Sequence, residues 1–269
     1  MLCDLGVIEG PVVLFGGPYS NLHATEALLR EAATLPGATL ICTGDVVAYC
    51  ADPAATTQAI MDSGAVVVAG NCEQQIAANA LECGCGFEAG TACDLLSKGW
   101  FSHASAGVTD AQRGWMAGLP DLLCFTHHGR RIGVLHGGVG DVARFLWSVS
   151  PDQAFAQEWA AFEALAGGVD AIVAGHSGIP FIKDTPRGQW VNAGVIGIPP
   201  HDGSQTTRFV LLHRGRFVVR ALHYDALGAQ AAMVRAGLTQ GYHDSLVSGY
   251  WPSEEVLPSS LRVLSPASG

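Results

Sequence analysis

The sequence is poor in basic residues and contains no basic run. Fourteen Lys and Arg stand against 24 Asp and Glu, which gives a formal net charge of −10. Proteins that bind the nucleic-acid backbone depend on Lys and Arg to neutralise phosphates. The shortage of cations therefore argues against a nucleic-acid partner, and we expect a small-molecule substrate. Nothing in the sequence predicts the oligomeric state.

Long apolar runs and a secretory signal are also missing. No apolar stretch reaches the roughly 18 to 20 residues that span a bilayer, and the N-terminal sequence MLCDLGVIEGPVV lacks the basic start and continuous apolar segment of a signal peptide. In a chain without such a signal, the eight cysteines are expected to be reduced thiols rather than a disulfide framework. We therefore expect a cytoplasmic protein with no membrane partner.

The chain shows neither an internal repeat of solenoid length nor a low-complexity linker. Strand and helix patterns run to about residue 225, and two helical stretches, 226–236 and 239–248, then precede a tail rich in Pro and Ser. A chain of this length can form one large α/β domain. We predict that domain over residues 1–225, with a C-terminal helical extension and tail over residues 226–269 packed on it.

Two short aliphatic runs organise the first half of the chain. Residues 38–42 and 65–69 have the character of buried strands, and residues 53–62, which begin with a proline, have that of a helix between them. Gly44-Asp45 follows the first run and Gly70-Asn71 follows the second. Because the carboxyl ends of parallel strands meet at one edge of a sheet, Asp45 and Asn71 should lie side by side.

Two histidines end later apolar runs in a similar way. His136 follows the run 131–135, and His176 follows the run 169–174 after one glycine. A single histidine at a strand end more often has a structural role, and Asp45 alone could be a turn or capping residue. Two imidazoles with a carboxylate and an amide oxygen, however, suit Zn, Mn or Fe(II). Asp45, Asn71, His136 and His176 together predict a site for one divalent transition metal.

The arrangement of the predicted elements indicates an α/β protein with two sheets. Strands alternate with helices in the first half, and the second half has strands close together, at 122–126, 131–135, 189–192, 207–213 and 216–224, with a helix at 153–166. This order favours two packed sheets with helices outside.

In order and spacing, the motifs resemble those of the calcineurin-like metallophosphoesterases, specifically the bacterial subgroup of small phosphodiesterases and phosphatases. The resemblance covers about residues 12–225 and rests on Ser20-Asn21-Leu22, Gly44-Asp45 with Tyr49 and Asp52-Pro53, Gly70-Asn71-Cys72-Glu73, His136-Gly137, Gly175-His176, and Asn192-Ala193-Gly194 with Gly197 and Pro199. It implies a four-layer α/β/β/α sandwich with a two-metal site between the strand ends. In that family a metal-bridged hydroxide attacks phosphorus, and both metals stabilise the phosphoryl oxygens.

The departures from the family pattern concern one of its two metals. The first motif, Asp-x-His-Gly-Asn, reads Gly17-Pro18-Tyr19-Ser20-Asn21, and the motif Gly-His-x-His reads Gly175-His176-Ser177-Gly178. The side chains missing at Gly17, Tyr19 and Gly178 are those that bind one metal in the family. The ligands of the other metal are all present, as Asp45, Asn71, His136 and His176. The resemblance therefore implies one intact metal site beside an altered one.

The cysteines near the altered site leave two interpretations open. Cys83, Cys85 and Cys93 form a C-x-C pair with a third cysteine eight residues on, in the segment that runs over the site in the family. With Cys50 and Cys72 they could hold a second metal through thiolates. The alternative is that all five are small buried residues in a reducing compartment. On the first interpretation, at least one of the three should lie near Gly17 and Gly178, with Tyr19 lining the same cavity.

The resemblance favours a metal-dependent phosphoesterase-like hydrolase, with Asp45, His136 and Tyr19 as candidate catalytic residues. Tyr19 could be a ligand, a proton donor or a packing residue. A single cation can still acidify a bound water and act as a Lewis acid. Two histidines and a carboxylate are also the ligand set of non-haem Fe(II) oxygenases, so a repurposed non-hydrolytic metalloenzyme is the second hypothesis. A non-catalytic metal-binding protein is the third, because a fold does not decide function.

Overall fold

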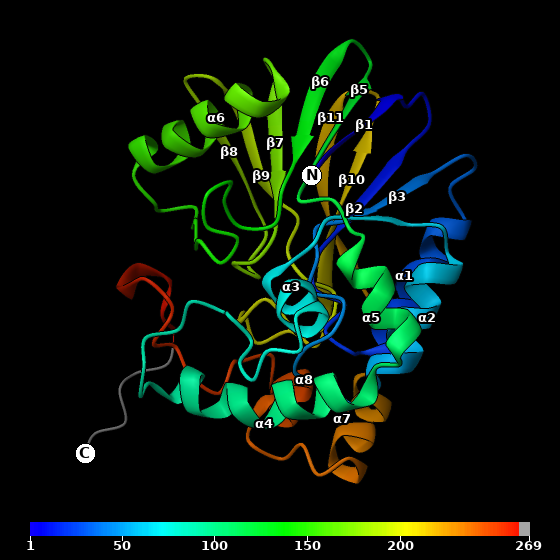
Figure 1. Ribbon diagram of the computed structural model, residues 1–269, viewed down its shortest axis with the longest axis vertical. Coiled ribbons are helices and arrows are strands. Elements are labelled where there is room, and N and C mark those ends of the chain that lie inside the picture. The colour runs from blue at the N-terminus through cyan, green and yellow to red at the C-terminus, as the bar shows by residue number, and fades with distance from the viewer. Residues whose placement is uncertain (264–269) are drawn as a thin grey trace.

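Two β-sheets pack face to face in the computed structural model, which describes residues 1–263 (Figure 1). The first sheet has the strand order β1 (Leu2–Val7), β5 (Leu122–His127), β6 (Arg130–Val134), β7 (Ala171–Ala174), β9 (Gly188–Asn192) and β8 (Phe181–Thr185). The second has the order β11 (Arg216–Leu222), β10 (Thr207–His213), β2 (Val12–Phe15), β3 (Thr39–Cys42) and β4 (Val66–Val67).

Helices cover both outer faces of this pair of sheets and complete a four-layer α/β/β/α sandwich, as expected. On the first sheet, α6 (Asp152–Ala166) packs through its own apolar cluster. The other helices share a core with the second sheet: α1 (Leu22–Ala33), α2 (Pro53–Asp62), α3 (Asn71–Ala77), α4 (Ala92–Gly107), α5 (Asp110–Ala117), α7 (Ala226–Arg235) and α8 (Tyr242–Ser248). A short 3-10 helix spans Ser259–Leu261.

The strand β2 shows how one apolar run serves two cores. Val12 and Leu14 face the other sheet, whereas Val13 and Phe15 face the helices, and all four side chains are fully buried. Successive side chains of a strand point to opposite faces. A strand buried on both faces therefore has a continuous aliphatic sequence instead of an alternating one.

The parallel pairing of strands brings their carboxyl ends to one edge of the sandwich. In the second sheet β2, β3 and β4 run parallel, and in the first sheet β6, β7 and β9 do the same. Asp45 lies in the loop that follows β3, and Asn71 is the first residue of α3, the next element after β4. The loops that follow β6 and β7 carry His136 and His176. Each sheet therefore contributes two of the four predicted metal ligands.

Two edge strands were not predicted, and one helix is shorter than expected. In β1 and β8 the burial alternates between exposed and half-buried residues, so neither has the continuous apolar run of a central strand. The helix that begins at Asn71 ends at Ala77, short of the expected end near residue 81. A boundary near residue 225 stays a prediction, although α7 packs on α1. Within residues 1–263, no helix is both long enough and apolar enough to cross a membrane.

Candidate metal centre

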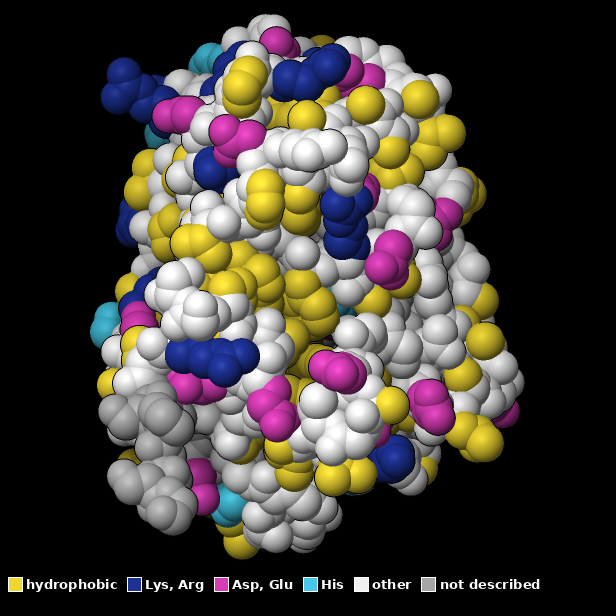
Figure 2. All heavy atoms as spheres, turned by 90° about the vertical axis from the view of Figure 1, so that its left-hand side faces the viewer, with side chains coloured by type: hydrophobic (Ala, Val, Ile, Leu, Met, Phe, Trp, Pro, Cys, Tyr) yellow, Lys and Arg dark blue, Asp and Glu magenta, His cyan; other side chains and the backbone are white. Residues whose placement is uncertain are grey.

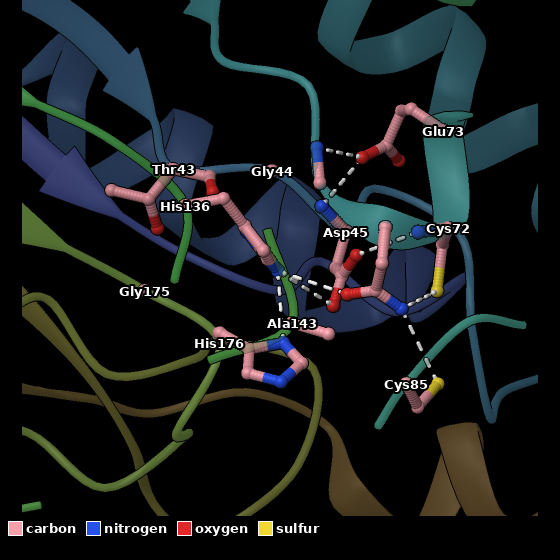
Figure 3. Close-up of polar contacts among 12 residues, drawn as sticks. Thr43, Gly44, Asp45, Cys72, Glu73, Cys85, His136, Ala143, Gly175 and His176 are labelled. Atoms are coloured by element: carbon pink, nitrogen blue, oxygen red, sulfur yellow. Dashed lines mark hydrogen bonds and ion pairs between the residues drawn. The ribbon is translucent and has the colours of Figure 1, made fainter. Parts of the chain in front are cut away.

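Asp45, His136 and His176 meet at the shared edge of the two sheets, with their polar atoms directed at one another (Figure 3). The side chain of Asn71 joins them through its contact with His136. Nε2 of His136 lies 3.1 Å from Oδ1 of Asn71, 3.1 Å from Nδ1 of His176 and 3.4 Å from Oδ2 of Asp45. All four residues are at least 92% buried, with exposed fractions from 0% to 8%. The structure therefore brings together the four residues that the sequence singled out.

Backbone groups hold two of these side chains in the orientation that a metal needs. Nδ1 of His136 lies 2.5 Å from the carbonyl oxygen of Thr43, and because that oxygen can only accept, Nδ1 carries the proton. Nδ2 of Asn71 donates to the carbonyl oxygen of Cys83 at 2.9 Å. These bonds direct the Nε2 of His136 and the Oδ1 of Asn71 to the centre of the cluster, as supporting hydrogen bonds do around bound metals.

The cluster contains an excess of acceptors, which a cation would balance. In its neutral form His136 turns a lone pair, not a proton, toward Oδ1 of Asn71 and Oδ2 of Asp45. Burial lowers the pKa of His136, but the Asp45 carboxylate and the Thr43 carbonyl outweigh this effect, so the net shift is upward. Burial raises the pKa of Asp45, but His136 and His176 lower it below its usual value. The raised pKa of His136 reflects the negative charge beside it, and a bound cation would balance the same charge.

The distances within the cluster also fit a coordination shell. Bonds of about 2.0 to 2.1 Å in a tetrahedral site place neighbouring ligand atoms about 3.3 to 3.4 Å apart. The separations from Nε2 of His136, at 3.1 to 3.4 Å, are close to that value. Burial and the neighbouring His136 lower the pKa of His176 to about 3, so His176 is neutral and its ring can offer a lone pair. The residues present therefore fit a bound divalent metal.

Glu73 supports the loop that carries Asp45, a role that the sequence did not reveal. Its carboxylate accepts backbone N–H bonds from Asp45 and Val46, both at 2.8 Å, and from Gly70 at 2.9 Å. Burial and the nearby Asp45 carboxylate raise the pKa of Glu73 to about 7. A glutamate three residues into a helix commonly bonds back to the N-cap, and Gly70-Asn71-Cys72-Glu73 has this spacing. That signal could have identified Glu73.

Two of the three predicted ligands that follow glycines, Asp45 and His176, have strained backbones. Asp45 and His176 both have φ of +59°, in the left-handed region that residues other than glycine rarely adopt. The preceding Gly44 has φ of +98°, and a Cβ there would lie 2.7 Å from the nitrogen of Gly70 and 2.8 Å from Nδ1 of His136. Backbone strain of this kind persists where the surrounding structure imposes it, often at functional sites.

Aromatic rings stand at the positions where the family pattern has further ligands. Tyr19 packs against Gly17, and the ring of Trp251 lies 3.3 Å from where a Cβ of Gly178 would be. Burial, and then the charge of Asp45, raises the pKa of Tyr19 well above its usual value, so its hydroxyl is protonated. Tyr19 therefore has the form of a donor and not of a phenolate ligand.

Trp251 is held in place by an interaction that the sequence did not predict. Its backbone N–H donates to Nδ1 of His201 at 2.8 Å, and its indole N–H donates to the carbonyl oxygen of Pro199 at 2.7 Å. Since Nδ1 of His201 accepts, Nε2 is the protonated nitrogen, and it lies 2.6 Å from a carboxylate oxygen of Glu254. No local spacing links His201 to residues about 50 positions later, so only the tertiary structure reveals this contact.

A cavity opens on the side of the cluster formed by Asp45 and His176. About 520 Å³ of it is free of protein atoms, part of this open to solvent, but only about 40 Å³ is wide enough for water. Since a water needs about 10 to 15 Å³ by this measure, the inner part suits a cation with a few waters. Six aromatic side chains line the cavity: Tyr19, Tyr49, Phe87, Phe145, Tyr242 and Trp251. Among residues 1–263, no Lys or Arg does so.

The expectation of reduced cysteines is wrong for one pair. Cys83 and Cys85 are joined in a disulfide, and the other six cysteines are free. Cys85 and Cys93 line the cavity with Tyr19 and Gly178, as the thiolate hypothesis requires, but a disulfide has no thiolate to offer a metal. Burial raises the pKa of Cys50 and of Cys72, which keeps both thiols protonated. A second metal held by thiolates stays a prediction, and Cys83 and Cys85 could take part only after reduction.

The comparisons with known proteins agree with the fold. Residues 18–215 match the calcineurin-like phosphoesterase superfamily domain. No curated protein sequence matches the chain significantly. The fold is similar to that of a metallophosphoesterase from Sphaerobacter thermophilus, with a TM-score of 0.69 and 16% identity over 90% of this chain and 99% of that one.

Two further structures have the same fold at low sequence identity. A hypothetical protein from Pyrococcus horikoshii OT3 superposes with a TM-score of 0.72 and 16% identity, over 93% of this chain and 99% of that one. A putative diadenosine tetraphosphatase gives a TM-score of 0.51 and 14% identity, over 82% of this chain and 98% of that one. At such identities, these similarities concern the fold alone.

Proposed function

The chain belongs to the calcineurin-like phosphoesterase superfamily, and we propose that it is a phosphodiester hydrolase that works with one divalent metal. The observation that carries this proposal is the convergence of a carboxylate, an amide oxygen and two imidazoles on one buried point, with too few protons to satisfy them. A cation at that point satisfies all four groups at once. Zn, Mn and Fe all accept this ligand set.

Each residue has a distinct task in this proposal. Asp45, Asn71, His136 and His176 hold the metal, and Thr43, Cys83 and Glu73 orient them. When bound, the metal supplies Lewis acidity toward a phosphoryl oxygen and lowers the pKa of a nearby water. Tyr19 lines the cavity beside Asp45 and carries a protonated hydroxyl, so it is our candidate donor to the leaving oxygen.

The charge around the cavity favours a diester over a monoester. A phosphomonoester dianion needs more neutralisation than a diester monoanion, and electrostatic stabilisation is usually the largest catalytic effect. Among residues 1–263, no Lys or Arg lines the cavity, and Asp45 adds a negative charge to it. With a single metal, the site suits a monoanionic small molecule. A cytoplasmic location is part of this proposal.

Elemental analysis of protein purified without chelator tests the metal centre directly. We expect one equivalent of Zn, Mn or Fe per chain. His176→Ala should lower this value below about a tenth, because losing a ligand costs more than the 10- to 100-fold in affinity typical of residues that only support the ligands. His223→Ala, at an exposed histidine, is the matched control and should keep the metal. A metal-free wild-type protein would contradict the proposal, and bound iron without hydrolysis would favour the non-hydrolytic metalloenzyme instead.

Steady-state kinetics tests the reaction. Bis(p-nitrophenyl) phosphate should be hydrolysed with a higher kcat/KM than p-nitrophenyl phosphate in the presence of Mn, Zn or Fe(II). Hydrolysis by the His176→Ala protein should fall to background. Efficient turnover of the monoester would contradict the charge argument, and activity that persists in His176→Ala would contradict the assignment of the site.

A further inference from the structure

Phe87 and Phe145 place two aromatic faces opposite each other at the mouth of the cavity. Their ring centroids are 6.3 Å apart and their planes differ by only 22°. Both side chains are half-buried, so neither is enclosed by the core. A planar group between two rings needs a spacing of about 7 Å, twice a carbon–carbon contact of about 3.5 Å. Because the gap between the ring planes cannot exceed the distance between their centroids, the rings must separate by at least about 0.7 Å to admit such a group.

The position of Phe145 is tied to the metal centre. Its ring lies 4.3 Å from that of His176 and stacks on Trp147 at 5.5 Å, with an angle of 2° between the planes. Beside His176, the hydroxyl of Ser177 donates to the carbonyl oxygen of Leu146 at 2.7 Å and accepts from its N–H at 3.1 Å. This contact joins the segment of Phe145 to that of His176 and so helps to set the distance between their two rings.

The aromatic pair also stands between two cavities. A second, outer cavity, with about 760 Å³ free of protein atoms and part of this open to solvent, shares Phe87, Cys93, Phe145 and Val256 with the cavity at the metal centre. Figure 2 shows the face that carries these segments, where hydrophobic side chains gather across the middle and the surface is hollowed. A substituent that extends from a phosphorus at the metal centre into the outer cavity therefore passes the two rings.

Charge limits what this substituent can carry. The charged residues that line the outer cavity are Glu88, Glu255 and Arg262. The Arg262 guanidinium already donates to the carbonyl oxygens of Leu257 at 2.9 Å and Glu255 at 3.3 Å. Two carboxylates against one engaged guanidinium give no net attraction for a second phosphate group. The outer cavity thus disfavours polyphosphate substituents.

From this arrangement we propose that the substrate is a phosphodiester monoanion with a planar aromatic substituent, which stacks between Phe87 and Phe145. The inference specifies the substrate class of the proposed hydrolase and rests on that function. Aromatic pairs attract each other beyond the effect of buried area alone. A flat ring therefore gains more at this position than an aliphatic group of similar size.

Calorimetric titration of the metal-loaded protein tests the aromatic site without relying on turnover. The probes are methyl(phenyl)phosphinate and methyl(cyclohexyl)phosphinate, monoanions that resemble a diester and contain no ester bond to hydrolyse. Hydrophobicity alone would favour the cyclohexyl probe. We expect the phenyl probe to bind about three- to tenfold more tightly to the wild-type protein. In Phe87→Leu and Phe145→Leu this ratio should fall to about one.

Phe87→Tyr is the matched control, because it keeps the ring and should keep the preference for the phenyl probe. Equal binding of both probes by the wild-type protein, or binding of neither, would overturn the inference. An unchanged preference in Phe87→Leu would also overturn it. The preference for the phenyl probe without any diester hydrolysis would support the aromatic site and count against the hydrolase, so the two proposals can fail separately.

Discussion

The ring of Tyr19 occupies the space that a side chain at Gly17 would need. A Cβ atom at Gly17 would lie 2.6 Å from Cζ of Tyr19 and 2.6 Å from Cγ1 of Val195. Gly17 also has φ of +40°, in the region that favours glycine. The residues at positions 17 and 19 are therefore coupled, since the ring of Tyr19 fits only because residue 17 has no side chain.

This relationship predicts a large loss of stability for Gly17→Ala. The variant should lower the free energy of unfolding by about 2 to 5 kcal/mol, from backbone strain and overpacking together. Gly37→Ala is the matched control, because Gly37 has φ of +69° and its Cβ would meet nothing within 4 Å. Denaturant unfolding of both variants separates the backbone strain, which both share, from the overpacking, which only Gly17→Ala causes. Equal losses for the two variants would show that the Tyr19 ring moves aside freely.

Glu73→Gln should weaken both the fold and the metal centre. The carboxylate accepts three buried backbone N–H groups, whereas an amide has one oxygen and would turn its NH₂ toward a donor. We expect a loss of about 1 to 3 kcal/mol for each donor left unsatisfied, and metal affinity about 10- to 100-fold weaker. Thermal unfolding and metal titration measure these effects.

Glu26→Gln serves as the control for Glu73→Gln. Glu26 makes an exposed ion pair with Arg30 at 3.6 Å, and such pairs contribute about 0 to 1 kcal/mol. The metal affinity of the Glu26→Gln protein should equal that of the wild type. If Glu73→Gln behaves like Glu26→Gln, then Glu73 does not hold the loop of Asp45 in place.

The disulfide predicts a specific thiol count. Denatured but unreduced protein should show six free thiols per chain, rising to eight after reduction, because Cys83 and Cys85 are joined and the other six cysteines are free. The metal content of the unreduced protein should not exceed one equivalent. Eight thiols before reduction would contradict the disulfide. A second equivalent of metal in protein whose eight cysteines are all reduced would support a site built from thiolates.

Local signals in the sequence were sufficient to locate the four predicted metal ligands. Each follows an apolar strand and a glycine or stands directly at a strand end, and parallel pairing brings Asp45 beside Asn71 and His136 beside His176. The packing of the two sheets then brings the two pairs together. The helical pattern of residues 53–62 and the proline at its start likewise located α2, which spans Pro53–Asp62. Edge strands were missed because they are only partly buried, which weakens the apolar pattern.

The tertiary structure alone decided what surrounds those ligands. The cavity wall is made of aromatic rings from segments as distant as Tyr19, Phe87, Phe145 and Trp251, and no sequence spacing relates them. The packing of Tyr19 against Gly17 and the bond between Cys83 and Cys85 likewise depend on three-dimensional proximity. Strand periodicity and turn residues act over a few positions, and they determined where the ligands stand. Side-chain packing acts between segments far apart in the chain, and it determined which side chains line the cavity.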